Sequence, residues 1–210
     1  MASVRAFATD TPSHVRGRDG VVRPVNETMS LADFMALDWP EKQHWELIRG
    51  TPILTPSPIP FHQSLLSEVM VWMLRQLDDR PEFLLLYDED VLFPDFEDYL
   101  RPDVSIFTRD QVDMNSVPVR VLPLLVVEAL SPSTGGRDWG EKKEIFAQAG
   151  VPEYWIADPS NGALAVHLAP ANGNYTPQVM DAEGFLTSPF FGCRVKIHFD
   201  GKTYRVESRA

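Results

Sequence analysis

The stretch VLPLLVVEALSPSTGGRDWGEKKEIFAQAGVPEYWIAD, residues 121–158, decides the fold expected for this chain. It begins with an apolar run, Val121–Val127, which ends at a single carboxylate, Glu128. A turn rich in Ser, Pro and Gly follows, then a helical pattern, then a second apolar run, Tyr154–Ala157. A strand, a crossover helix and a second strand of this length are typical of a βαβ unit with parallel strands.

The helix inside this stretch has its own start and stop signals. Asp138 with Glu141 three residues later forms an aspartate version of the capping box. Gly150 followed by Pro152 is a common way for a helix to end. The sequence therefore predicts a helix that begins at Asp138 and ends at Gly150.

Glu128 is unusual, because a charge rarely ends a buried strand without a partner or a metal. A second carboxylate, Asp103, opens a strand that the alternation of Val104 and Ile106 predicts about 25 residues earlier. Two carboxylates at neighbouring strand ends can hold Mg²⁺ or Mn²⁺, which keep water and phosphate oxygens as their other ligands. Such an ion lowers the pKa of a bound water, and Lys142 could orient that water or stabilise negative charge.

Composition bounds the class of protein. The chain has 210 residues, of which 44% are hydrophobic and 23% charged, as expected for one globular unit. One cysteine, Cys193, fits a reducing compartment, and no stretch approaches 18 apolar residues. We therefore expect a soluble cytoplasmic protein without a membrane partner. The net charge of −11 argues against a general nucleic-acid coat.

The rest of the chain is expected to build one domain, residues 29–210, preceded by a flexible arm, residues 1–28. Before the central stretch we expect a helix at Leu31–Leu37, a hairpin at Trp45–Thr55, a helix at Pro60–Leu77 and strands at Phe83–Tyr87 and Val91–Phe93. After it, hairpin turns are expected to join short strands at Leu164–Leu168, Gln178–Met180, Arg194–Phe199 and Thr203–Val206.

Pro102-Asp103, followed by Glu128 at the end of an apolar strand, resembles the PD-(D/E)XK nuclease superfamily. In the common form of that pattern the lysine lies two residues after the glutamate, a position that Leu130 occupies here. The segments HWELIRG, TPSPIPFH, RPDVSIF, LLVVEALSPST and RDWGEKKEIFAQAGVPEYWIAD together resemble the bacterial Uma-type family, a group described as restriction endonucleases. The resemblance covers roughly residues 31–160.

In the Uma-type pattern the lysine lies in the helix, as D-x-x-x-K-x-x-x-Y. Asp138 and Lys142 match that pattern, and Phe146 stands in place of the usual tyrosine. The resemblance implies an α/β fold of the restriction-endonuclease type, with a mixed sheet flanked by helices and a hairpin-rich C-terminal extension. It implies metal-dependent hydrolysis of phosphodiester bonds, with DNA as the expected nucleic acid substrate, and a homodimer. The strand-rich C-terminal part, with Phe190-Phe191 and a basic tail, is a candidate contact of that dimer. The site residues that it implies are Asp103 and Glu128 as metal ligands, these two with Lys142 and Glu46 as catalytic residues, and His62 and Asp138 as accessory residues.

Structural roles for these residues, and a non-catalytic function for the protein, remain as alternatives. Asp138 and Lys142 could form an ordinary i,i+4 surface pair, and Asp103 could cap a strand end. His62, in the first turn of a helix, is expected to be neutral and to have a structural role. The rival function is a non-catalytic module that keeps the nuclease fold for binding or protein interaction, which the acidic charge favours.

Other chemistries find less support in the sequence. The cysteine and histidines lack zinc-ligand spacing, Gly135-Gly136 lacks the Lys-Ser/Thr of a phosphate loop, and no G-x-S-x-G elbow is present. A carboxylate pair also suits glycoside hydrolysis, but the lysine favours phosphodiester chemistry.

Lys142 and its neighbour Lys143 point about 100° apart on a helix, so only one of them can face the carboxylates. Phe146 is four residues after Lys142 and apolar, which places Lys142 on the inward side. We expect Lys142→Ala to abolish cleavage and to leave the fold and metal binding largely intact.

Overall fold

A six-stranded mixed sheet forms the centre of the molecule. The computed structural model describes residues 12–55, 57–93, 96–131 and 135–210. In spatial order the strands of this sheet are β12 (Asn174–Pro177), β11 (Leu164–Ala171), β10 (Glu153–Ala157), β9 (Leu125–Ala129), β8 (Val104–Thr108) and β5 (Phe83–Tyr87). Only β9 and β10 run parallel within it, and the other neighbours are antiparallel. The expected mixed sheet, with a βαβ unit at its centre, is confirmed.

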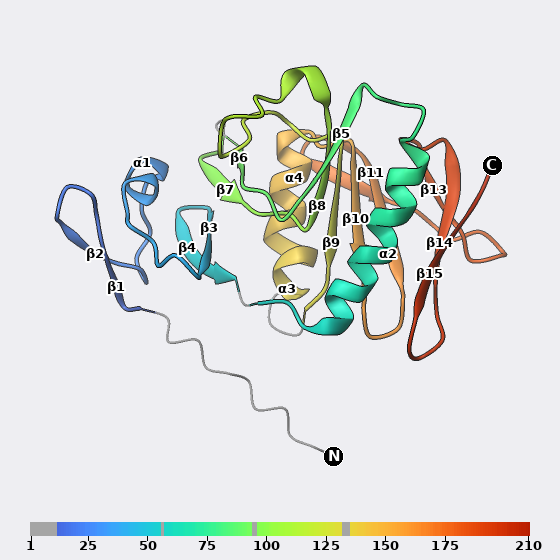
Figure 1. Cartoon of the computed structure of the whole chain (residues 1–210), viewed down its shortest axis with the longest axis horizontal. Coiled ribbons are helices and arrows are strands. Elements are labelled where there is room, and N and C mark those ends of the chain that lie inside the picture. The colour runs from blue at the N-terminus through green and yellow to red at the C-terminus, as the bar shows by residue number, and fades with distance from the viewer. Residues whose placement is uncertain (1–11, 56, 94–95, 132–134) are drawn as a thin grey trace, which may run out of the picture.

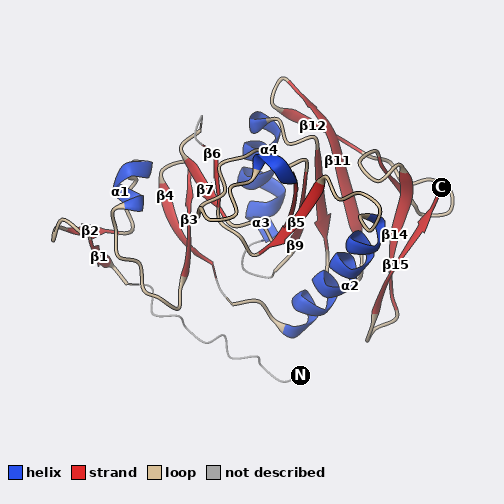
Figure 2. Ribbon diagram, turned by 45° about the horizontal axis from the view of Figure 1, so that its top comes forward, coloured by secondary structure: helices blue, strands red, loops and turns tan. Residues whose placement is uncertain are grey.

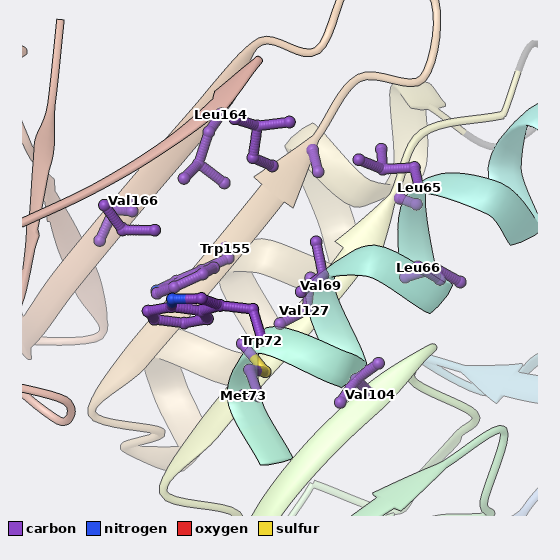
Figure 3. Close-up of a cluster of buried hydrophobic side chains, with 14 of the residues drawn as sticks. Leu65, Leu66, Val69, Trp72, Met73, Val104, Val127, Trp155, Leu164 and Val166 are labelled. Carbon is purple, nitrogen blue, oxygen red and sulfur yellow. The ribbon is translucent and has the colours of Figure 1, made fainter. Parts of the chain in front are cut away.

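Helices cover both faces of this sheet (Figures 1 and 2). One face packs against α2 (Pro60–Gln76), whose apolar stripe of Leu65, Val69, Trp72 and Met73 meets the strands (Figure 3). Strand alternation sends Val127 and Trp155 to this face. The opposite face packs against α4 (Lys143–Ala149) through Ile145 and Phe146, and receives Val126, Tyr154 and Ile156.

The connection from β9 to β10 differs from the sequence prediction at its start. The helix begins before Asp138, with the short α3 (Gly135–Arg137), and Asp138–Lys142 forms a π-helical turn that leads into α4. Asp138 is therefore a buried residue inside the helix, and the prediction that it caps the helix is wrong. Gly150 ends the helix as predicted, with φ 86° in the left-handed region that glycine enters without steric penalty.

A second sheet of four strands lies beside the first, at the blue and green side of Figure 1. Its strands, in spatial order, are β4 (Thr51–Thr55), β3 (His44–Ile48), β7 (Asp98–Leu100) and β6 (Val91–Phe93). Arg49 and Gly50, both with positive φ, form the tight turn between β3 and β4. This hairpin is the one that the sequence predicted.

The N-terminal segment is not the flexible arm that we expected, at least from residue 12 onward. Strands β1 (His14–Arg16) and β2 (Val22–Pro24) pair as a hairpin, and α1 (Leu31–Met35) follows with Ser30 as its N-cap. Val15 and Val25 are buried in a small apolar cluster with Phe34, Leu37, Trp45 and Leu47. The segment is polar overall, so nothing in the sequence indicated that Val15 and Val25 would be buried in this cluster. Residues 1–11 lie outside the described residues.

The C-terminal part forms a three-stranded antiparallel sheet of β13 (Leu186–Ser188), β14 (Cys193–Phe199) and β15 (Tyr204–Arg209). The predicted strand at Gln178–Met180 is absent, because β12 pairs with β11 just before it. Phe190 and Phe191 pack against the main core, where Phe191 contacts Trp72 and Trp155. This pair therefore packs within the chain, and both residues remain partly exposed. The dimer contact at the C-terminal part stays a prediction. No helix among the described residues is long and apolar enough to cross a membrane.

Candidate active site

Strand register brings Asp103 and Glu128 together. Val104 of β8 lies opposite Val127 of β9 in an antiparallel pair, so Asp103, one residue earlier, lies next to Glu128, one residue later. The backbone N–H of Ala129 donates to Oδ2 of Asp103 at 2.7 Å. Glu128 is the penultimate residue of β9 and is buried on the face that α4 covers.

Lys142 connects this pair of strands with the second sheet. Its ammonium nitrogen lies 3.0 Å from Oε1 of Glu128 and 2.9 Å from Oε1 of Glu46, which β3 contributes. The side chains of all three residues are at most 6% exposed. The lysine therefore holds two carboxylates from two different sheets.

Burial and charge act in opposite directions on Lys142. Desolvation disfavours its charged form, but Glu128, Glu46 and Asp138 outweigh this effect and raise the pKa of Lys142. Burial raises the pKa of Glu128 well above its ordinary value, and Asp103 adds to the rise while Lys142 opposes it. The lysine is thus a firmly held cation in an environment that contains more carboxylates than cations.

His62, in the first turns of α2, reaches the same place from the other face of the sheet. Its Nε2 lies 3.2 Å from Oδ2 of Asp103, and the ring is buried. Burial alone would lower the pKa of His62, but the hydrogen bond and charge of Asp103 raise it above its ordinary value. The nearby carboxylate of Asp103 thus outweighs burial, and its effect on the pKa of His62 is opposite in direction to the effect expected from the helix N-terminus.

Asp138 lies on the same side as Lys142, one helical turn earlier. Its side chain is buried, and burial raises its pKa to about 6 although Lys142 acts in the opposite direction. Its backbone carbonyl accepts a hydrogen bond of 3.0 Å from the hydroxyl of Tyr154 in β10. Asp138 and Lys142 are therefore part of the buried cluster, and the alternative of a surface pair does not hold.

The two neighbouring lysines differ as the helical geometry predicts. Lys142 is buried, whereas Lys143 is partly exposed and its ammonium lies 5.9 Å from the centre of the Trp139 ring. Phe146, one turn after Lys142, is fully buried against Phe93 and Tyr154. A phenylalanine suffices at this position, because its ring packs in the apolar cluster beneath α4.

Two residues that hold Glu46 were not singled out from the sequence. The backbone N–H of Arg101 donates to Oε1 of Glu46 at 2.8 Å, and the hydroxyl of Thr55 donates to its Oε2 at 3.2 Å. Arg101 stands directly before the Pro102-Asp103 motif, which was the available signal. Thr55 lies in β4, opposite His44, and only the pairing of β3 with β4 shows that it approaches Glu46.

The sequence predicted six site residues, and the structure brings them to one end of the central sheet: Glu46, His62, Asp103, Glu128, Asp138 and Lys142. Their contacts form two linked groups, Glu46–Lys142–Glu128 and His62–Asp103. Within the described ranges, no three His, Cys, Asp or Glu side chains are arranged to hold a metal ion.

The chain matches a family model in a comparison with protein families. The family model described as "Uma2: Putative restriction endonuclease" matches residues 31–197, most of the chain and all of the residues of this site. The chain belongs to the Uma2 family. Its membership confirms the family resemblance seen in the sequence, and it supports a nuclease-type function for the fold.

A solved structure of low sequence identity shares this fold. The crystal structure of a putative nuclease belonging to DUF820, from Anabaena variabilis, is similar with a TM-score of 0.64 at 19% sequence identity. The similarity covers 78% of this chain and 91% of that one. At this identity the comparison supports the restriction-endonuclease-like fold of the Uma2 chain and nothing finer. No curated protein matches the chain.

Proposed function

We propose that this Uma2-family chain is a nuclease that hydrolyses phosphodiester bonds in DNA with the help of Mg²⁺ or Mn²⁺. The observation that carries the proposal is the buried Lys142, whose ammonium lies between Glu46 and Glu128 beside the His62–Asp103 pair. A protein core rarely buries three carboxylates, here Glu46, Glu128 and Asp138, around one lysine for stability alone, because each buried charge is costly.

The donor set fits a hard divalent cation. Asp103 and Glu128 come from adjacent strands, and Mg²⁺ needs only one or two carboxylates besides water and phosphate oxygens. Burial raises the pKa values of Glu128 and Asp138, and the neighbouring carboxylates add to the rise while Lys142 opposes it. Asp103 and Glu128 would hold the ion, which would supply Lewis acidity and an acidified water.

The chain's own residues have separable tasks in this proposal. Lys142, which stays protonated, would stabilise the negative charge that develops on the phosphate. Glu46 holds the ammonium together with Glu128, and His62 holds Asp103 in place by a hydrogen bond. Asp138 adds negative charge that keeps Lys142 protonated.

A cleavage assay tests this function. Purified protein with Mg²⁺ or Mn²⁺ is incubated with plasmid, single-stranded DNA and RNA, next to a Glu128→Gln variant. We expect cleavage that requires the metal and is lost in the variant. Cleavage that persists in Glu128→Gln would assign the activity to a contaminant or to another site.

A non-catalytic module is the second candidate, and one observation favours it. The site residues are hydrogen-bonded to one another, and within the described residues no group of three acids or histidines is arranged around a metal position. Absence of cleavage on all three substrates, together with absence of Mn²⁺ binding by calorimetry, would favour this candidate.

We also propose a homodimer, because cutting both strands of a duplex requires two sites of this kind. Light scattering measures the mass directly, and a mass of 23.7 kDa at high concentration would correspond to a monomer. In that case, nicking of plasmid would be expected before linearisation.

A further inference from the structure

Arg101 stands where the two sheets of the molecule join. It follows β7 of the four-stranded sheet and precedes β8 of the six-stranded sheet by three residues. Its guanidinium forms a two-pronged contact with Asp90, with Nε 2.7 Å from Oδ1 and Nη2 2.8 Å from Oδ2. Its third nitrogen, Nη1, contacts Nδ1 of His44 in β3. A fork of this kind fixes the direction of the arginine as well as its position.

Asp90 is itself held rigidly. The hydroxyl of Tyr99 donates to its Oδ2 at 2.7 Å, and its backbone carbonyl accepts from the N–H of Val119 at 2.8 Å. The side chains of Asp90 and Arg101 are only 11% and 19% exposed, so solvent screens their interaction weakly. This pair is therefore a rigid anchor and differs from the mobile ion pairs of a protein surface.

The anchor reaches the site by two routes. The backbone N–H of Arg101 donates to Oε1 of Glu46, the same oxygen that Lys142 contacts at 2.9 Å. Two residues further along the chain, Asp103 accepts from His62 and from the backbone of Ala129. Glu46 belongs to the four-stranded sheet, and Asp103 adjoins the six-stranded sheet. Arg101 bonds to Glu46 and precedes Asp103 by two residues, so the position of Arg101 sets the placement of these two carboxylates relative to each other.

We propose that Asp90 and Arg101 form a positioning pair that aligns the Glu46–Lys142 contact with Asp103, and that this alignment requires the forked geometry of arginine. The inference rests on the proposed nuclease function. Neither side chain is placed in contact with substrate. A displacement of about 1 Å between reacting groups can lower a rate about a hundredfold, so a small shift at this junction would be measurable.

The test compares Arg101→Lys with Arg109→Lys. Arg109 lies at the opposite end of the same strand, where its side chain donates to the carbonyls of Pro81 and Phe83 at 2.7 and 2.9 Å. Both changes keep the positive charge and remove a forked contact, but only one adjoins the site. For each variant, kcat and KM are measured, together with hydrogen exchange of the backbone N–H at position 101 and, as a reference, of Val127.

We expect Arg101→Lys to lower kcat at least about tenfold with KM nearly unchanged, because positioning acts on the reaction step. Exchange at position 101 should accelerate while exchange at Val127 stays slow. Asp90→Asn should do the same, and the double variant should lose little more than either single variant, because the two side chains act as one unit. Arg109→Lys should leave kcat and the exchange at position 101 unchanged.

A kcat of Arg101→Lys within about twofold of wild type, or a loss that Arg109→Lys matches, would overturn the inference. If the wild-type protein cleaves no substrate, the proposed function fails and the exchange measurement decides the positioning role. Unchanged exchange at position 101 in Arg101→Lys would then overturn it as well.

Discussion

Lys142 contacts two carboxylates with one ammonium, so its removal affects both stability and chemistry. Without it, Glu46 and Glu128 would be buried with no cation, and breaking a buried ion pair costs on the order of 3–5 kcal/mol. We therefore expect Lys142→Ala to lose cleavage and also to unfold more easily, which revises the expectation from the sequence that the fold stays largely intact. Lys143→Ala should change unfolding by less than about 0.5 kcal/mol, because this side chain is partly exposed.

Chemical denaturation at several pH values checks this prediction. The raised pKa of Lys142 means that its stabilising charge is fully present below the ordinary lysine range. The deficit of Lys142→Ala should therefore be large at neutral pH. It should shrink as the pH falls toward about 4, where protonated glutamates no longer need a cation. A deficit that does not depend on pH would argue against buried carboxylate charge as its cause.

The pKa of His62 should lie above the ordinary value for histidine, and the pKa of His167 should lie below it. Asp103 raises the pKa of His62 in spite of its burial, whereas burial, with a smaller effect of Lys143, lowers the pKa of His167. The stability that the His62–Asp103 pair contributes is present below pH about 6.5 and is lost as the pH rises through the folded-state pKa of His62. NMR titration without divalent ions should show His62 above and His167 below about 6.5.

Asp103→Asn is the matched change for this titration. It removes the charge that favours protonated His62, so the pKa of His62 should fall below its ordinary value while that of His167 stays where it was. A His62 that titrates identically in both proteins would show that Asp103 is not its partner in solution.

At the scale of elements, the sequence predicted what local pattern determines. The apolar stripe of α2, the alternation in β8 and the left-handed Gly150 are each signalled by residues within the element itself. The π-helical turn was not predicted, because Asp138 with Glu141 reads equally well as a helix start. Asp138 and Lys142 are both buried in the structure, and their burial depends on tertiary packing that the local sequence pattern does not report.

The π-helical turn has one residue more than an α-helical turn, and Gly140 lies at its centre. Deleting Gly140 should convert it to α-helix and place Asp138 three residues before Lys142 instead of four, which changes the angle between their side chains and shortens the rise between them. We expect the deletion to lose cleavage, with helix content by circular dichroism unchanged. Gly140→Ala is the control, because a Cβ there meets nothing within 4 Å, and it should keep activity. Retained activity in the deletion variant would show that the turn is not needed for the site.

At the scale of the whole molecule, the site lies where two sheets meet, and the sequence could not predict that junction. The order of strands and helix along the chain predicted that Asp103, Glu128 and Lys142 would share a site. Only the family resemblance predicted that Glu46 would join them. Residues 98–100 and 104–108, separated by three residues, pair in different sheets, and this division brings β3 to the central strands. No periodic pattern encodes which sheet a three-residue strand such as β7 joins.

The N-terminal hairpin of β1 and β2 should contribute to the free energy of unfolding, although many residues separate it from the central sheet along the sequence. Val15 in β1 is 5% exposed and packs in the cluster that contains Trp45 and Leu47, the neighbours of Glu46 in β3. Val22 in the paired strand β2 is 50% exposed. We expect Val15→Ala to lower the free energy of unfolding by about 2 kcal/mol through the cavity it leaves, and Val22→Ala by less than about 0.5 kcal/mol. Urea denaturation of both variants measures the difference, and equal values would mean that the hairpin does not dock on the cluster in solution.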